Sequence, residues 1–244
     1  MKWITNFLKA IAEFFSRKKP EPQIPQKPSE PVNQTPTVPA PEPKPKFKMH
    51  EFKKGQIGVD ISHHNRRVDL ELLAKNVDFI YMKATEGESF VSSKYVERAK
   101  KLKEMGTVAW GAYHYYRTNK GPAVQAEHFI KYVDVESGLP PVLDIEAINN
   151  NFKPHHRKDL QIFLNLVESK TKIRPIIYTG YYFAKDEFKP TEEFAKYKLW
   201  LPWYTSDFGR VKTPKPWDKI TIWQYTEHGT IKGVDGNVDI NRVV

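Results

Sequence analysis

The chain has 244 residues, of which 39% are hydrophobic and 13% aromatic, enough to bury the core of one domain of about 200 residues. It contains no cysteine, which excludes disulfide bonds and thiolate sites for zinc or iron–sulfur clusters. A formal net charge of +10 predicts attraction to an anionic partner, and it leaves nucleic acid, a membrane surface and an acidic cell wall as candidates.

Residues 1–18 have the pattern of an amphipathic helix. The segment is too short to span a bilayer and is interrupted by polar residues. No small-residue cleavage site follows it, so it does not read as a secretory signal. It fits a membrane-surface anchor, and it fits equally a helix that docks on this protein's own domain or on a partner. The apolar stripe consists of Trp3, Ile4, Phe7, Leu8, Ile11, Phe14 and Phe15.

Residues 19–52 are predicted to be a disordered, proline-rich linker. Their mixture of Pro, Glu, Lys, Gln, Ser and Thr cannot form a hydrophobic core and favours the extended polyproline II conformation. We therefore expect a semi-rigid spacer in front of a catalytic domain at 53–244.

The domain at 53–244 alternates short apolar runs with longer amphipathic ones, which indicates an α/β protein with a parallel sheet. The last third is rich in strands and poor in helices, so we expect an eight-stranded barrel whose late helices are missing. Predicted strands lie at 57–61, 79–83, 108–115, 141–146, 175–178, 197–201, 220–224 and 237–240. Predicted helices lie at 69–75, 94–105, 123–134 and 158–169.

Polar and aromatic residues fall at the end of nearly every predicted strand. In parallel barrels the carboxyl ends of the strands meet at one rim, where active sites lie. Their convergence predicts a functional site at this rim. The residues are Asp60, Ser62, Glu86, Tyr113, His114, Tyr115, Asp144, Glu146, Tyr178, Trp200, Tyr204, Trp223, Gln224, Tyr225 and Asp239.

Asp144 and Glu146 supply the predicted chemistry. Two residues apart on a strand, they point to the same face with Cβ atoms about 6–7 Å apart. Repulsion and partial burial should raise one pKa, which places a protonated acid beside an ionised carboxylate, as cleavage of a glycosidic bond requires. Taken alone, such a pair is more often solvated, but aromatic residues around it suit stacking on sugar rings.

Seven sequence blocks closely resemble glycoside hydrolase family 25, the Chalaropsis-type lysozymes of bacteria, fungi and phage. The resemblance runs from about Gln56 to the C-terminus, and the blocks occur in the family's order. They are GVDIS at 58–62, KATEG at 83–87, GAYH at 111–114, LDIE at 143–146, IYT at 177–179, WQY at 223–225 and VDIN at 238–241.

The resemblance implies a TIM-like (β/α) barrel of five βα units followed by three strands. It implies a lysozyme (muramidase) that hydrolyses the β-1,4 bond between N-acetylmuramic acid and N-acetylglucosamine in peptidoglycan. Glu146 resembles the general acid, and we expect retention of configuration, with either the substrate N-acetyl group oriented by Asp144 or a carboxylate as nucleophile. Asp60 and Asp239 resemble the other carboxylates of the site.

Sugar subsites are implied at Tyr113, Tyr178 and Trp223. The predicted strand ends add Tyr115, Trp200, Tyr204 and Glu86 to the expected substrate-binding set. Two stretches depart from the family's usual pattern: His63 to Arg67 replaces a common Gln-Gly turn, and Pro202 stands where alanine is common. These departures affect substrate contacts rather than the acid.

The remaining features predict neither a cofactor nor a metal. The pairs His63-His64 and His155-His156 are neighbours whose side chains should point apart, so we interpret them as surface histidines. No phosphate loop, serine-hydrolase elbow or nucleic-acid-binding module is present in the sequence. We expect a monomer.

The expected partners are peptidoglycan glycan strands and, through the helix at 1–18, a membrane surface. The protein would act at the bacterial cell wall, as a phage endolysin or bacterial autolysin does, with cytolytic, antimicrobial effect. A non-catalytic wall-binding module and a chitinase-like glycosidase on a related barrel are the alternatives.

Overall fold

A computed structural model describes residues 48–146 and 153–244. The predicted helix at 1–18 and most of the predicted linker at 19–52 lie outside the described residues. Within the described part of the chain, every helix is too short or too polar to cross a bilayer.

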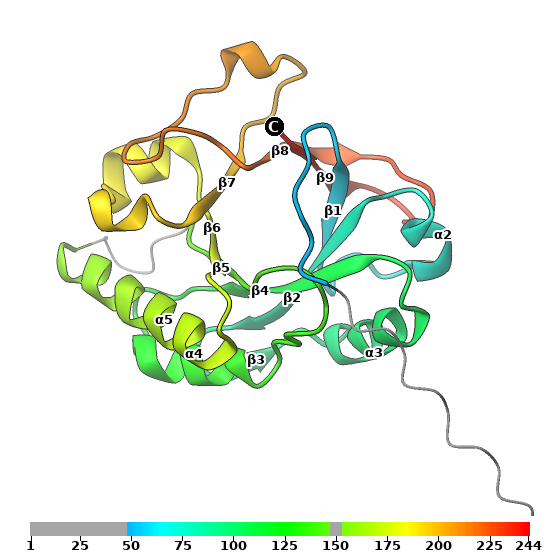
Figure 1. The fold of residues 1–244 in the computed structure, drawn as a ribbon, viewed down its shortest axis with the longest axis horizontal. Coiled ribbons are helices and arrows are strands. Elements are labelled where there is room, and N and C mark those ends of the chain that lie inside the picture. Colours follow the sequence, from blue (N-terminus) through cyan, green and yellow to red (C-terminus); the bar gives the residue numbers. More distant parts are fainter. Residues whose placement is uncertain (1–47, 147–152) are drawn as a thin grey trace, which may run out of the picture. The chain divides into compact units, whose positions relative to one another are not determined.

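The described residues form a closed barrel of eight strands, as predicted (Figure 1). The order is β1-β9-β8-β7-β6-β5-β4-β2, and β1 pairs with β2 to close the ring. Neighbouring strands are parallel except at β9, which is antiparallel to both β1 and β8. The strands are β1 (Ile57–Ile61), β2 (Phe79–Glu86), β4 (Ala109–Tyr115), β5 (Val142–Asp144), β6 (Ile176–Tyr178), β7 (Lys198–Pro202), β8 (Ile222–Gly229) and β9 (Val238–Val243). A two-residue strand, β3 (Phe90–Val91), pairs with the end of β2.

Helices occupy the first four crossovers, and short helical turns replace them later. Asp69 caps the first helix by accepting a hydrogen bond from the Leu72 N–H. The second helix ends at Gly106, whose φ of 60° is a left-handed conformation that glycine adopts readily. The helices are α2 (Leu70–Ala74), α3 (Tyr95–Met105), α4 (Pro122–Ile130) and α5 (His155–Thr171). The turns are η1 (Phe183–Phe188), η2 (Glu192–Phe194) and η3 (Phe208–Arg210).

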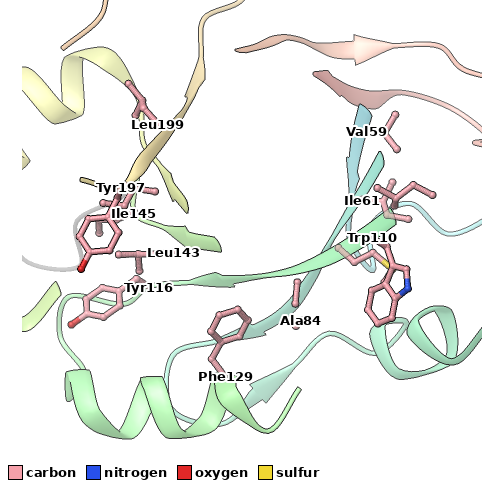
Figure 2. Packing of buried hydrophobic residues seen from close by; sticks show 14 of the residues in the cluster. Val59, Ile61, Ala84, Trp110, Tyr116, Phe129, Leu143, Ile145, Tyr197 and Leu199 are labelled. Carbon is pink, nitrogen blue, oxygen red and sulfur yellow. The ribbon is translucent and has the colours of Figure 1, made fainter. Parts of the chain in front are cut away.

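Alternation along the strands divides the core into an outer shell and a barrel interior, because successive strand residues point to opposite faces. Outward residues such as Ile61 and Leu143 pack against the helices, and Phe129 of α4 points toward the strands (Figure 2). The inward apolar set includes Phe79, Tyr81, Val142, Ile176, Trp200 and Ile222.

Large aromatic side chains fill the lower part of the barrel. A Cβ atom on Gly58 would lie 2.2 Å from the ring of Phe79, so glycine is required where this ring crosses the interior. Above this apolar plug, the next inward positions carry polar groups, among them Asp60 on β1 and Asp144 on β5. The plug thus closes the barrel below and leaves a polar mouth at the carboxyl ends of the parallel strands.

Contacts with the barrel begin inside the range predicted as linker. The His50 N–H donates to the Gly138 carbonyl at 2.7 Å, and the Phe52 ring lies 5.7 Å from that of Phe79. These two residues pack with the barrel domain.

Candidate active site

A cavity of about 230 Å³ opens at the polar mouth of the barrel. All four predicted catalytic carboxyl groups line it, together with four of the predicted aromatic residues. Its lining residues are Asp60, Tyr113, Val142, Asp144, Glu146, Tyr178, Trp200, Tyr204, Gln224, Glu227 and Asp239.

Strand register explains why residues so distant in sequence meet here. Asp60 on β1 is the direct partner of Asp239 on antiparallel β9. Across the barrel, Asp144 at the end of β5 is flanked by Tyr115 on β4 and Tyr178 on β6. Register thus places Asp60 beside Asp239 and Asp144 between two tyrosines, and all three carboxyl groups line the cavity.

Asp60 and Asp239 are joined by a hydrogen bond between their side chains. Burial raises the pKa of Asp60 to about 6, although amide donors from Gln224 and Asn241 oppose the rise. Burial and the charge of Asp60 raise the pKa of Asp239 to about 8. The two carboxyl groups therefore share a proton near neutral pH.

Gln224 connects this carboxyl pair to the aromatic wall. Its Nε2 donates to Asp60 Oδ1 at 3.0 Å, while its Oε1 accepts hydrogen bonds from the hydroxyls of Tyr178 at 3.0 Å and Tyr204 at 3.2 Å. Asn241 holds the same aspartate, since its Nδ2 donates to Asp60 Oδ1 at 2.7 Å. The side chain of Asp60 is thereby fixed in position.

Asp144 and Glu146 form the second carboxyl pair. Burial, followed by the charge of Glu146, raises the pKa of Asp144 well above its usual range. Desolvation by the surrounding protein, followed by the charge of Asp239, also raises the pKa of Glu146, even though this side chain is partly exposed at the mouth. Lys83 lowers both pKa values. The cavity can therefore supply a protonated carboxyl group beside an ionised one.

The sequence profile of the glycosyl hydrolases family 25 matches residues 59–234. The chain belongs to this family. It is therefore a glycosidase, and the predicted family is confirmed. Among its relatives, the uncharacterized protein YegX of Escherichia coli K12 is 31% identical over 191 residues, which cover 75% of this chain and 68% of the relative.

Lysozymes are also among its relatives. The autolytic lysozyme of Clostridium acetobutylicum is 27% identical over 190 residues, covering 76% of this chain but only 55% of the relative. The crystal structure of a lysozyme from Streptomyces coelicolor matches with a TM-score of 0.70, covering 78% of this chain and 92% of that one. At 24% identity, this match supports the fold alone.

Two expected substrate-binding residues of this family 25 hydrolase lie beside the cavity. Glu86 pairs with Lys83 at 2.5 Å and with Arg117, and it lines a neighbouring hollow of about 430 Å³. The Tyr115 ring lies 4.7 Å from Lys83 Nζ and 4.8 Å from the Arg117 guanidinium carbon. Burial, with the charges of the two acids on the β5 side, raises the pKa of Tyr115 to about 12.

Of the expected substrate-binding residues, Tyr115 and Trp223 line neither hollow, and Trp223 is turned away from the mouth. Its side chain is only 3% exposed, and its Nε1 donates to the Trp203 carbonyl at 2.7 Å. Because adjacent strand residues point to opposite faces, Gln224 faces the mouth and Trp223 faces the outer shell. The sequence prediction placed Trp223 near the end of a strand at 220–224, whereas Trp223 is the second residue of β8, and the prediction did not give the direction of the side chain.

His114 also points away from the mouth. Its ring stacks on Phe163 with centroids 5.0 Å apart, and its Nδ1 lies 2.8 Å from Thr85 Oγ1. Burial lowers the pKa of His114 to about 3, so this histidine is neutral and part of the outer shell.

Neither histidine pair diverges as the sequence suggested, since the ring centroids lie 4.1 Å apart in His63–His64 and 4.2 Å apart in His155–His156. His156 is also buried and is not a surface histidine. With Asp159, the second pair places possible ligand atoms within 4.8 Å of one another. However, His156 Nδ1 accepts a hydrogen bond from the Lys153 N–H at 2.9 Å, which leaves the proton of the neutral ring on Nε2. That arrangement opposes metal binding by His156.

Three contributors to the site were absent from the predicted set: Asn241, Glu227 and Lys83. Asn241 lies in the VDIN block and Lys83 in the KATEG block. The sequence therefore located both residues near the site but did not indicate that they interact with its carboxyl groups. Glu227 lies beyond the WQY block, and only the length of β8 brings it to the cavity.

Proposed function

We propose that this glycosidase is a muramidase that hydrolyses the β-1,4 bond between N-acetylmuramic acid and N-acetylglucosamine in peptidoglycan. The observation that carries the proposal is the meeting of Asp60, Asp144, Glu146 and Asp239 around one cavity at the barrel mouth. Membership of family 25 and the similarity to lysozymes support the choice of substrate.

Glu146 is the general acid in this proposal. It is the member of the Asp144–Glu146 pair that reaches solvent, so a bridging oxygen of a glycan can approach it. Its raised pKa keeps the proton available at a higher pH than an ordinary glutamate would. Asp144 lies deeper, at 6% exposure, and is poorly placed to protonate a leaving group.

Asp144 is proposed to orient the substrate. Its Oδ1 is buried and accepts no hydrogen bond from the described residues. Such an oxygen is costly to leave unpaired, and the amide N–H of an N-acetyl group is a donor that would pair with it. This supports the substrate's own N-acetyl group, rather than a carboxylate, as the nucleophile.

The acetyl oxygen attacks the anomeric carbon while the glycosidic bond breaks, and the leaving oxygen takes the proton of Glu146. Water next attacks the same carbon, returns its proton to Glu146 and reopens the acetyl group. Two inversions give net retention of configuration.

The remaining cavity residues are proposed to bind the sugar. Tyr113, Tyr178 and Tyr204 supply ring faces and hydroxyls, and Trp200 forms part of the floor. Glu86, which lines the neighbouring hollow, and Tyr115, which packs against Lys83 of that hollow, are proposed to contact a more distant part of the substrate. The net charge of +10 suits an anionic envelope, where we propose that a monomer acts, with membrane association through residues 1–18.

The test combines the purified protein with purified peptidoglycan. Clearing of turbidity with new reducing ends would support an enzyme, whereas co-sedimentation without clearing would identify a wall-binding module. Mass spectrometry of the products completes the test. A muramidase leaves muramic acid at the reducing end, whereas a chitinase-like glycosidase cleaves chitin oligomers instead.

A further inference from the structure

A cluster of three aromatic residues lies just outside the cavity, on the loops that follow β6 and β7. The Tyr181 ring lies 5.2 Å from that of Tyr182 and 5.3 Å from that of Trp203, at steep angles to both. Tyr182 and Trp203 are 6.2 Å apart, and their planes differ by only 30°. Tyr181 thus supports two rings that share nearly one orientation.

Tyr182 is the most exposed of the large hydrophobic residues in the described chain, with 67% of its surface open to solvent. An exposed aromatic ring is common by itself, but a ring supported by two others at the rim of an enzyme mouth is characteristic of a binding surface. The Trp203 indole N–H is engaged by none of the described residues, so it can donate to a ligand.

The backbone holds this cluster in place. The Trp203 N–H donates to the Gln224 carbonyl at 3.0 Å, and the Trp203 carbonyl accepts from Trp223 Nε1 at 2.7 Å. On the other loop, the Thr179 N–H donates to the Trp200 carbonyl at 3.2 Å. A surface built on such fixed segments binds with little loss of conformational freedom.

The cluster is continuous with the cavity through Tyr204, the residue after Trp203. Tyr204 is 51% exposed, and its hydroxyl donates to Gln224 Oε1 inside the cavity. One chain segment therefore presents consecutive aromatic residues to the cavity and to the rim.

The size of the cavity also indicates that the substrate extends beyond it. Its volume of about 230 Å³ is below the range of about 300–1,000 Å³ that is typical of ligand sites. A polymer of sugars must therefore continue over the rim. The hollow beside β2 and the aromatic cluster beside β7 lie on opposite sides of the mouth, because three strands separate β2 from β7 in either direction around the ring.

We propose that Tyr182 and Trp203 form an outlying sugar subsite, here called the aromatic platform, which stacks on a pyranose ring of a glycan chain several sugars from the bond that is cut. The inference rests on the proposed function and adds an extended substrate to it. Flat apolar faces of sugar rings pack on aromatic rings, while the Tyr182 hydroxyl and the Trp203 indole N–H reach sugar hydroxyls.

The test uses the full chain and peptide-free glycan strands, prepared by amidase treatment of peptidoglycan and separated by length. For each variant, kcat/KM is measured on the shortest strand that is cleaved and on strands several disaccharide units longer. For Tyr182→Ala, the ratio of the long-strand to the short-strand value should fall about fivefold to tenfold, the size of one lost stacking contact. Tyr182→Phe keeps the ring and should keep the ratio of the wild type.

Val96→Ala is the matched control, because Val96 is an exposed residue on α3, away from the cluster. A wild-type ratio in Tyr182→Ala would overturn the platform, whether both rates are unchanged or both fall equally. If the wild type cleaves no strand, the proposed function fails, and calorimetry decides the platform separately. Weaker binding of the long strands to Tyr182→Ala would then support it, and equal binding would refute it.

Discussion

Asp60 and Asp239 face each other across the antiparallel pair β1–β9 and share a hydrogen bond between their carboxyl groups. The arrangement keeps one proton in the site at a pH where an isolated aspartate has lost it. It also stores repulsion, since removal of that proton would leave two buried charges in contact.

The pH dependence of stability should reveal this pair. The pKa of Asp239 is about 8 in the folded protein, against a usual value of 3.8. Between these values the folded state binds more protons than the unfolded chain, so the contribution of Asp239 to stability is present below pH 4 and is lost as the pH rises toward 8. Asp239→Asn is neutral and can still donate to Asp60. Its Tm should exceed that of the wild type above pH 8 by about 3 °C and approach it near pH 4.

Asp218→Asn is the control for this measurement, because Asp218 is a surface aspartate whose side chain is 90% exposed. Calorimetric scans across the pH range would give both differences. A Tm difference for Asp239→Asn that does not change with pH would contradict the shared proton.

Glu146→Gln should abolish turnover while glycan binding survives. A neutral amide cannot deliver the proton to the leaving oxygen, so kcat should fall by about three orders of magnitude or more. The wild-type rate should decline on the alkaline side as Glu146 loses its proton, and its raised pKa moves that decline upward. Glu97→Gln, at an exposed position on α3, serves as the control. Near-normal kcat in Glu146→Gln would refute the assignment of the acid.

Gln224 is expected to act as a positioning residue through Asp60. Gln224→Glu keeps an acceptor for Tyr178 and Tyr204 but turns an oxygen toward Asp60 in place of the donor. Loss of that buried hydrogen bond should lower kcat about tenfold to a hundredfold. It should also shift the acidic limb of the pH–rate profile upward, because Asp60 would hold its proton more tightly. A fall in kcat with an unshifted profile would indicate a purely structural role.

The acetyl group of the substrate can be tested directly. If the N-acetyl group is the nucleophile that Asp144 orients, glycan strands that lack acetyl groups should bind but not be cleaved. Strands that are chemically re-acetylated provide the matched control, with cleavage followed by new reducing ends. Equal rates on both substrates would favour a carboxylate nucleophile instead.

The strands of this fold were predictable because most of them are buried on both faces, so that they occur as short apolar runs. All eight barrel strands overlap such runs, whereas β3 is too short to produce one. Helix ends were less predictable. The apolar pattern continues past Ile130 to Tyr132 and Val133, but i to i+3 hydrogen bonds already form a turn there.

The sequence predicted which residues form the site better than it predicted their contacts. The carboxyl groups could be located from the predicted strand ends, because parallel strands all end at the same rim of the barrel. The hydrogen bond between Asp60 and Asp239 depends on the register of two strands about 180 residues apart, which no local pattern encodes. The prediction that Trp223 lines a sugar subsite was wrong for a related reason. Which residues of β8 face the barrel interior is set by the pairing of β8 with its neighbouring strands.

The segment at 1–48 should be dispensable for catalysis. Among the described residues, contacts with the barrel begin at His50, so a chain that starts at Met49 retains the hydrogen bond to Gly138 and the packing of Phe52 on Phe79. We expect this truncation to keep the wild-type kcat on purified peptidoglycan and to bind vesicles of anionic phospholipid more weakly, because the amphipathic stripe is gone. A second truncation that also removes His50 and Phe52 should lower the Tm. Loss of turnover in the shorter deletion would show that residues 1–48 belong to the catalytic fold, and unchanged vesicle binding would refute the anchor.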